Sequence, residues 1–391
     1  MVLGFVYFRF SDGGHLFWGK GMRGKMKRVI TISYNDLGIS WGPAIHFLEL
    51  WNNFAKNNQN ITVIGISPSW TKRKCILNPL FKHHSIEILD IKGVRQIIYD
   101  FRVFLYILRY TLNDDIIYIR YSSFHLFTIL YLILSNKKFV VEINGLAFED
   151  LTSARTKKWR IFLFLLQESL ILKKSKLIIT VSDGIKNTIR GRYKILNNIF
   201  TIRNGISDQF LKQNEIKQQL KSIIYVGTFT PWDGSYLIPK LAEKFPDINF
   251  ILIGSGLMKN KIESLGLTNI NCLGEINYSD LPKYYDQVDA ALVLYEYERH
   301  RNIEVSSIKT LEYFYSKLPI FTTNIPGQEF IATYDIGYLI GELEPIEQAF
   351  RNFINNYMTY NENYLKLNAE IFDNYSWKRT AELTYDLLRE F

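Results

Sequence analysis

The stretch DQFLKQNEIKQQLKSIIYVG, residues 208–227, decides how this chain is organised. Residues 208–222 are polar, whereas IIYVG at 223–227 is the short, β-branched run of a buried strand. On the amino-terminal side, similar strand-like runs alternate with helical patterns and occupy residues 29–33, 62–66, 116–119, 139–143, 177–181 and 200–202. On the other side they continue at 249–253, 270–273, 290–294 and 320–323. This alternation predicts two doubly wound α/β domains, each with a parallel sheet covered on both faces.

The domain boundaries follow from the same pattern. We predict a first Rossmann-like domain at 26–207, a linker at 208–222, a second Rossmann-like domain at 223–375 and a last helix at 376–391. Residues 1–25 show neither helical nor strand periodicity, and MKRVITIS from Met26 reads like the start of an α/β domain. We therefore expect 1–25 to be a disordered or misassigned extension. Ligands of parallel sheets bind at the carboxyl ends of the strands, so we expect the site in a cleft between the domains.

Composition excludes several protein classes. Hydrophobic residues make up 47% and charged residues 22%, which is typical of a globular protein. The two cysteines, Cys75 and Cys272, cannot form a disulfide framework, and the six histidines show no metal-ligand spacing. No apolar run reaches the ~18 residues that a membrane-spanning helix needs. We expect a cytoplasmic protein without structural zinc or a membrane span.

The charge is distributed unevenly. Residues 26–210 hold 26 basic and 13 acidic side chains, whereas 211–391 hold 17 and 24. A basic first domain indicates an anionic partner, either a nucleic acid or a membrane surface. The apolar stretches 101–112 and 159–174 carry basic residues, which favours peripheral contact with the inner face of the cell membrane, and no nucleic-acid motif is present. The alternative is that both helices only cover the sheet.

The motif with the clearest chemical meaning is EVSSIKTLE, residues 304–312, in which two glutamates stand eight residues apart. Ser306 or Ser307 is expected to cap a helix that ends at Pro319. The helix start offers free N–H groups and a partial positive charge, so it suits an anion, and Lys309 adds a cation. The pattern alone is also that of a capped surface helix with ordinary carboxylates.

This motif resembles the E-x7-E motif of retaining glycosyltransferases of the family-4 type, which have the GT-B fold. Further segments resemble the family's pattern in the same order, namely VEING at 141–145, TVS at 180–182, IRNGI at 202–206, YVGTFTPWDG at 225–234, FILIGSG at 250–256 and SW at 376–377. The resemblance covers roughly residue 27 to the end of the chain. It implies two Rossmann-like domains facing a central cleft, with the C-terminal helix crossing back to the first domain.

The resemblance also implies roles for individual residues. Glu304 would bind hydroxyls of the donor sugar, Glu312 would bind the ribose, and Lys309 would take up diphosphate charge. Asn144, at the strand end facing the donor sugar, completes the implied catalytic set. The implied donor-binding residues are Gly227, Thr228, Gly234, Gly254, Arg299, Arg301, Ser306, Ser307, Ile308 and Glu312.

Four residues of the first domain are candidates for the acceptor or a phosphate. Gly38 and Gly42 lie in the turn that opens the first helix, His46 follows one turn later, and Tyr121 follows a predicted strand. For His46 a structural role is the alternative. The resemblance implies a UDP- or GDP-type nucleotide sugar as co-substrate, with no cofactor and no catalytic metal.

The sequence departs from the family pattern at three places. Thr228 and Asp233 replace an Arg and a Lys of the glycine loop, Val305-Ser306-Ser307 replaces Gly-Phe-Gly, and Asn144 stands where a His is often found. We interpret the chain as a retaining glycosyltransferase that moves a sugar to a lipid-linked or polysaccharide acceptor in cell-surface glycan synthesis. The alternatives are a non-catalytic two-lobed nucleotide- or sugar-binding protein and a nucleotide-sugar epimerase on a similar scaffold.

Overall fold

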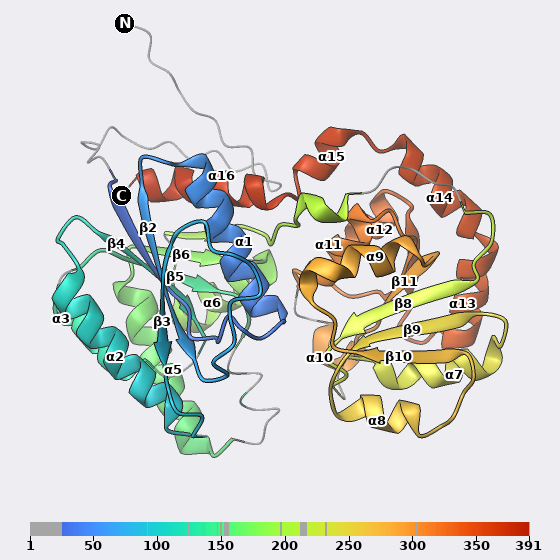
Figure 1. Ribbon diagram of the computed structural model, residues 1–391, viewed down its shortest axis with the longest axis horizontal. Coiled ribbons are helices and arrows are strands. Elements are labelled where there is room, and N and C mark those ends of the chain that lie inside the picture. Colours follow the sequence, from blue (N-terminus) through green and yellow to red (C-terminus); the bar gives the residue numbers. More distant parts are fainter. Residues whose placement is uncertain are drawn as a thin grey trace, which may run out of the picture.

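The fold consists of two α/β domains placed side by side (Figure 1). The computed structural model describes residues 26–91, 93–122, 125–135, 137–146, 148, 151, 156–195, 198–211, 217–230, 233–301 and 304–390. The expectation for residues 1–25 lies outside this set. Within it, every strand pair is parallel, as the alternating pattern predicts.

The first domain has a seven-stranded sheet of order β3-β2-β1-β4-β5-β6-β7. Its strands are β1 (Arg28–Ile32), β2 (Thr62–Ser69), β3 (Lys82–Glu87), β4 (Ile116–Tyr121), β5 (Phe139–Ile143), β6 (Leu177–Thr180) and β7 (Ile199–Thr201). The helices α1 (Gly42–Asn57) and α16 (Trp377–Arg389) cover one face. The other face is covered by α2 (Arg95–Tyr110), α3 (Leu126–Leu134), α5 (Lys158–Lys174) and α6 (Asp183–Tyr193).

The second domain has a six-stranded sheet of order β10-β9-β8-β11-β12-β13. Its strands are β8 (Ser222–Gly227), β9 (Asn249–Gly254), β10 (Ile270–Gly274), β11 (Ala290–Val293), β12 (Ile320–Thr323) and β13 (Gly337–Ile340). One face is covered by α9 (Leu281–Asp286), α11 (Ile308–Tyr315) and α12 (Glu329–Thr333). The other face is covered by α7 (Ile238–Lys244), α8 (Leu257–Glu263), α13 (Ile346–Asn355) and α14 (Tyr357–Lys366). The remaining helices of the described residues are the short α-helices α10 (Tyr297–His300) and α15 (Ala369–Asp373) and three 3-10 helices, at Asp208–Phe210, Ser235–Leu237 and Tyr278–Asp280.

Two strands that the sequence analysis does not predict lie at sheet edges. Strand β3 reads KHHSIE and is half-exposed, because an edge strand has a partner on one side only. Strand β13 is only four residues long. Neither has the long apolar run on which the prediction of central strands rests.

The chain crosses between the domains twice, and the two crossings lie against each other. The Ile206 N–H donates to the carbonyl of Tyr375 (2.8 Å), and the Trp377 N–H donates to the carbonyl of Ile206 (3.1 Å). A Cβ on Gly205 would come within 2.5 Å of the Trp377 nitrogen, so only glycine allows this approach. Helix α16 then packs on α1 in the first domain, which confirms the predicted crossing helix (Figure 1).

Among the described residues, no helix combines the length and hydrophobicity needed to cross a membrane.

Candidate functional site

The EVSSIKTLE motif forms the start of α11 at the boundary between the domains. Ser307 caps this helix by accepting a hydrogen bond from the Thr310 N–H (3.3 Å), so the second of the two predicted caps is the one used. The helix ends at Tyr315, four residues before Pro319. A Cβ on Gly42 would lie 4.0 Å from Cδ1 of Ile308, so the N-termini of α1 and α11 approach each other across the domain boundary.

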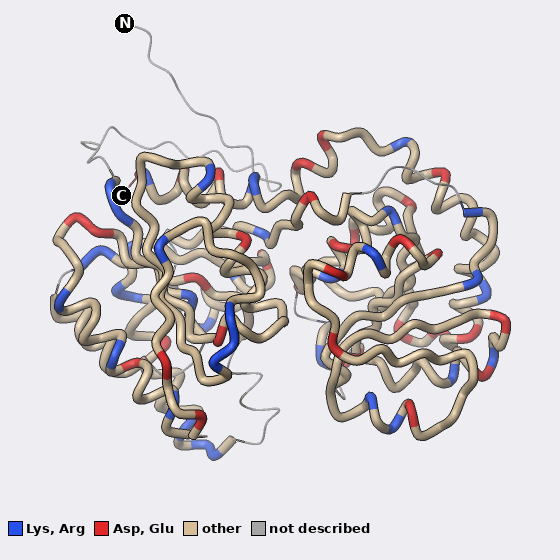
Figure 2. The backbone as a smooth tube through the Cα atoms, in the orientation of Figure 1, with Lys and Arg blue, Asp and Glu red and all other residues tan. Residues whose placement is uncertain are grey.

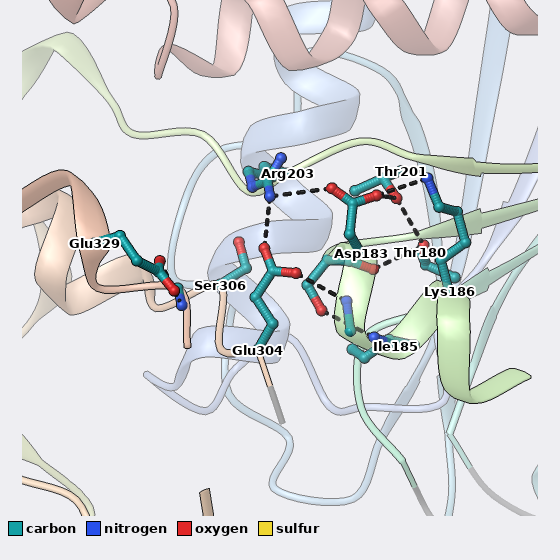
Figure 3. Close-up of polar contacts among 12 residues, drawn as sticks. Thr180, Asp183, Ile185, Lys186, Thr201, Arg203, Glu304, Ser306 and Glu329 are labelled. Atoms are coloured by element: carbon teal, nitrogen blue, oxygen red, sulfur yellow. Dashed lines mark hydrogen bonds and ion pairs between the residues drawn. The ribbon is translucent and has the colours of Figure 1, made fainter. Parts of the chain in front are cut away.

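Glu304 connects the two domains (Figure 3). One carboxylate oxygen accepts a hydrogen bond from the Gly184 N–H (2.8 Å), at the N-terminus of α6 in the first domain. The other pairs with Arg203 (2.5 Å), whose guanidinium also contacts Asp183 (3.2 Å). A Cβ on Gly184 would lie 2.8 Å from that of Glu304, so glycine is required for this approach. The Arg203 side chain therefore orients the motif's first glutamate.

Ser306, two residues later, is held by a single residue of the domain crossing. The Asn204 backbone N–H donates to the Ser306 hydroxyl (3.1 Å), and the Asn204 side-chain amide donates to the Ser306 carbonyl (2.6 Å). The start of the motif is therefore fixed to the domain crossing at both its hydroxyl and its carbonyl.

Glu312 lies in a different environment from Glu304. It is only 3% exposed and accepts a hydrogen bond from the Tyr285 hydroxyl (2.7 Å). Burial raises the pKa of its carboxyl to about 7, although Tyr285 and Lys309 act in the opposite direction. The two glutamates therefore differ in burial and in partners, a difference that their spacing does not reveal.

The raised pKa of Glu312 predicts a pH-dependent effect on stability. Between its ordinary pKa of 4.5 and about 7, the unfolded chain releases a proton that the native state keeps, so native stability falls as pH rises through this window. Glu312→Gln removes this loss. We therefore measure the difference in melting temperature, variant minus unsubstituted protein. We expect this difference to increase from pH 5 to pH 7.5 and to level off at higher pH. A difference independent of pH would contradict the assignment.

Lys309 is partly buried and faces two aromatic rings. Its ammonium nitrogen lies 5.1 Å from the ring centroid of Tyr225 and 5.5 Å from that of Tyr295. Burial lowers the pKa of this ammonium, while Asp233 and Glu312 act to raise it. Cation–π contacts leave the N–H groups of the ammonium available to an anionic ligand.

The glycine loop after β8 is closed by the two residues that replace the expected cations. The Thr228 hydroxyl donates to Asp233 (2.9 Å), and the Thr230 N–H donates to the same carboxylate oxygen (3.2 Å). The loop packs closely on the end of β9, because a Cβ on Gly254, which has φ of +127°, would lie 1.9 Å from the Gly227 carbonyl oxygen. Gly234, also at positive φ, brings the end of the loop against Leu294. The predicted donor-side glycines are thus brought together at the ends of β8, β9 and β11.

Asn144 and His46 meet at a buried carboxylate that the sequence analysis did not single out as a site residue. The Asn144 amide donates to Glu142 (2.6 Å), and Nε2 of His46 lies 2.7 Å from the same oxygen. Nδ1 of His46 contacts Oδ1 of Asn204 (2.6 Å). Glu142 belongs to β5, and the sequence analysis treated it only as part of an apolar strand run. A charged residue inside such a run is the signal that could have identified it.

Four further predicted residues lie elsewhere in the two domains. Tyr121 is buried in the first domain, where its hydroxyl accepts a hydrogen bond from Gln167 (3.2 Å). Arg301, beside α10, pairs with Glu298 (3.3 Å) on the surface, and Arg299 lies within α10. Gly38 lies in the β1–α1 turn, where its N–H donates to Asp36 (2.9 Å). In the described part of the chain, no group of three or more His, Cys, Asp or Glu side chains could hold a metal ion.

Two protein-family models match the two halves of the chain. Residues 42–210 match the family model described as Glycosyltransferase Family 4, and residues 207–370 match that described as Glycosyl transferases group 1. No curated protein matches the sequence.

Solved structures with a similar fold include a sucrose-phosphate synthase from Thermosynechococcus elongatus, with a TM-score of 0.73 and 14% identity over 93% of this chain and 98% of that one. WaaG, a glycosyltransferase involved in lipopolysaccharide biosynthesis, has a TM-score of 0.69 and 15% identity over 92% and 99% of the two chains. HepE from Anabaena, solved in complex with UDP-glucose, has a TM-score of 0.68 and 12% identity over 93% of this chain and 100% of that one.

Proposed function

Because this chain is a family-4-type glycosyltransferase of the GT-B fold that depends on a nucleotide sugar, we propose that it transfers the sugar with retention of configuration. The proposed donor is a UDP- or GDP-sugar bound mainly by the second domain. The proposed acceptor is a lipid-linked or polysaccharide glycan on the first domain, in cell-surface glycan synthesis. The observation that carries the proposal is the position of the EVSSIKTLE motif, whose Glu304 and Ser306 contact the first domain while Lys309 and Glu312 face the second.

The chemistry follows from these positions. Departure of a nucleoside diphosphate builds negative charge, and groups already oriented toward that charge lower the barrier most. The start of α11 supplies N–H groups and Lys309 supplies a cation on the donor side. Each oxygen of Glu304 has a second lone pair that can accept a bond from a sugar hydroxyl, although both already have a partner. The proposal includes no catalytic metal, and activity should therefore persist in EDTA.

A donor panel tests the function. Thermal-shift measurements with UDP, GDP and ADP identify the base, because a ligand at 100 times its Kd stabilises the folded state by about 2.7 kcal/mol. Turnover of matching nucleotide sugars with glycan acceptors should release the nucleoside diphosphate, and NMR of the product should show the donor's anomeric configuration. Binding without turnover would instead support the non-catalytic alternative. Conversion of the donor without any acceptor would support the epimerase.

We also propose that the first domain docks on an anionic membrane through α2, α3 and α5. Helix α5 packs Phe164, Ile171 and Leu172 into the core together with the polar Gln167 and Glu168, whereas other large apolar side chains of the same helix are exposed. Exposed large hydrophobic residues continue on the neighbouring helices α2 and α3. On the three helices they are Ile97, Phe101, Leu105, Leu108, Tyr110, Leu126, Leu130, Leu134, Trp159, Phe162, Leu163, Leu166 and Leu170. Basic residues flank this surface (Figure 2), with Lys157 and Lys158 at the start of α5 and Lys173 and Lys174 at its end.

Vesicle sedimentation tests this docking surface. We expect the protein to pellet with anionic but not neutral vesicles and to be released by salt, because exposed charges are screened over about 10 Å at 0.1 M. Replacing Phe162 and Leu166 together with Glu should abolish pelleting, since both are exposed and apolar. Leu257→Glu, at an exposed leucine of the second domain, is the matched control. Equal binding to neutral vesicles, or equally tight binding to duplex DNA, would contradict the proposal.

A further inference from the structure

Three basic residues stand side by side in the loop between β2 and β3. Lys72, Arg73 and Lys74 are all exposed, and within the described part of the chain none of their side chains forms a hydrogen bond or an ion pair. Figure 2 shows them as a continuous blue stretch of this loop. We call residues 72–74 the basic segment. Like charges this close repel one another, so an anion that lies against the segment is attracted by all three.

A buried carboxylate holds the basic segment in place. Asp36, which is 1% exposed, accepts hydrogen bonds from the N–H groups of Trp70 and Thr71 (both 2.9 Å) and from the Thr71 hydroxyl (2.8 Å). It also accepts from the Gly38 N–H (2.9 Å), and so joins this loop to the β1–α1 turn. A Cβ on Gly38 would lie 2.8 Å from that of Arg73, so glycine allows the close approach. The backbone of the segment is therefore fixed against the turn that precedes α1.

The basic segment lies at the edge of the sheet where ligands of parallel sheets bind. It follows the carboxyl end of β2, and the turn that it contacts follows the carboxyl end of β1. Further along the same loop, Ile76 and Leu77 pack against the apolar cluster that α1 and the second domain share. The segment thus lies on the first-domain side of the boundary between the domains, where the acceptor is proposed to bind.

The same loop contacts a helix of the docking surface. The Arg95 guanidinium, at the start of α2, lies over the ring of Trp70, 4.3 Å from its centroid. Ile97 and Phe101, one and two turns further along α2, are exposed residues of that surface. A lipid that stays in the membrane at α2 would therefore have its polar end near the loop that carries the basic segment.

We propose that the basic segment binds the phosphate groups that join the acceptor glycan to its lipid carrier. This rests on the proposed function, because it names the acceptor class of that same reaction as a glycan on a lipid phosphate or diphosphate. A phosphate monoester carries a charge of about −1.5 to −2 and three acceptor oxygens. Arg73 can bind two of these oxygens at once, while Lys72 and Lys74 act as point charges. The single charge of a polysaccharide carboxylate matches three basic side chains less well.

Binding of a short lipid diphosphate tests this site without any turnover. The triple variant Lys72→Ala, Arg73→Ala, Lys74→Ala is compared with the unsubstituted protein by calorimetry, with farnesyl diphosphate as the ligand and farnesol as its uncharged counterpart. We expect the triple variant to bind farnesyl diphosphate about tenfold to a hundredfold more weakly, because it loses hydrogen bonds to a charged group. Its affinity for farnesol should be unchanged. Equal affinity of the two proteins for farnesyl diphosphate would overturn the proposal.

The competing site for a diphosphate is the donor side, at Lys309. The loss caused by the triple variant should therefore be the same in a Lys309→Ala background. A loss that occurs only when Lys309 is present would assign farnesyl diphosphate to the donor side and overturn the proposal. The matched control removes three exposed lysines of the second domain together, and it should leave the affinity unchanged; these are Lys244, Lys261 and Lys283.

Two further measurements separate the phosphate of the acceptor from the headgroups of the membrane. If the triple variant lost its binding to phosphatidylglycerol vesicles but kept its affinity for farnesyl diphosphate, the segment would bind headgroups and the proposal would be wrong. In steady-state kinetics, KM should rise for the acceptor glycan on a lipid diphosphate and stay unchanged for its methyl glycoside. Since the farnesyl diphosphate result needs no turnover, a protein that binds this ligand through residues 72–74 but transfers no sugar would refute the proposed function alone.

Discussion

Lys309→Ala is expected to lower turnover by about 10²–10³-fold and to weaken nucleoside-diphosphate binding, because it removes a preorganised charge at the position of the leaving group. The glycine loop cannot compensate, since Thr228 and Asp233 stand where cations are expected and bond to each other (2.9 Å). The dipole of α11 contributes only about 0.3–2 kcal/mol. Lys309 forms no ion pair with a carboxylate in the described part of the chain, so its charge is available to a ligand.

The Lys309 prediction has three controls. Lys309→Arg should restore only part of the rate, because the planar guanidinium of arginine does not place its charge and N–H groups where the compact ammonium of lysine does. Lys283→Ala removes a lysine that pairs with Asp280 (3.0 Å) on the surface of the same domain, and it should leave turnover unchanged. Asp233→Lys in the Lys309→Ala background should recover some nucleotide affinity. Near-normal turnover of Lys309→Ala in steady-state kinetics would mean that another cation, such as Arg299 or Arg301, meets the diphosphate.

Glu304→Gln is expected to have the other large effect, a strong loss of turnover with nucleoside-diphosphate affinity nearly intact. The amide removes the charge that faces Arg203 (2.5 Å), and whichever way it turns, its NH2 faces either the guanidinium or the Gly184 N–H. The carboxylate proposed to bind sugar hydroxyls is thus both neutralised and displaced. Glu312→Ala should instead weaken nucleotide binding, because Glu312 is proposed to hold the ribose.

A comparison with Arg203→Ala separates sugar binding from domain attachment. That variant removes the ion pair to Glu304 but leaves its carboxylate and the Gly184 N–H contact in place. If Glu304 acts on the sugar, Arg203→Ala should retain much more turnover than Glu304→Gln. Equal losses in the two variants would mean that Glu304 serves only to join the domains. Identical behaviour of the Glu304 and Glu312 variants in both the rate and the binding assay would refute the division of roles.

The sequence predicted the central strands because their pattern is local. A strand buried on both faces requires a continuous apolar run, and such runs predicted β1 and β8 nearly to the residue. The Ser307 cap of α11 and the Ser376 start of α16 are also local signals. The edge strands β3 and β13 were not predicted, because an edge strand does not need a continuous apolar run.

Only the tertiary structure decided which residues meet. Glu304 contacts Gly184 and Arg203, which are 120 and 101 residues away, and no spacing rule connects them. His46 was a candidate because it lies one turn into the first helix, yet its partners come from β5 and from the domain crossing. Local sequence determined the elements, because each depends on the period of its own side chains. The partners of each site residue depend on how the two domains are docked. That docking requires close backbone approaches at Gly184 and Gly205, and the sequence alone does not show that these two glycines are contact points.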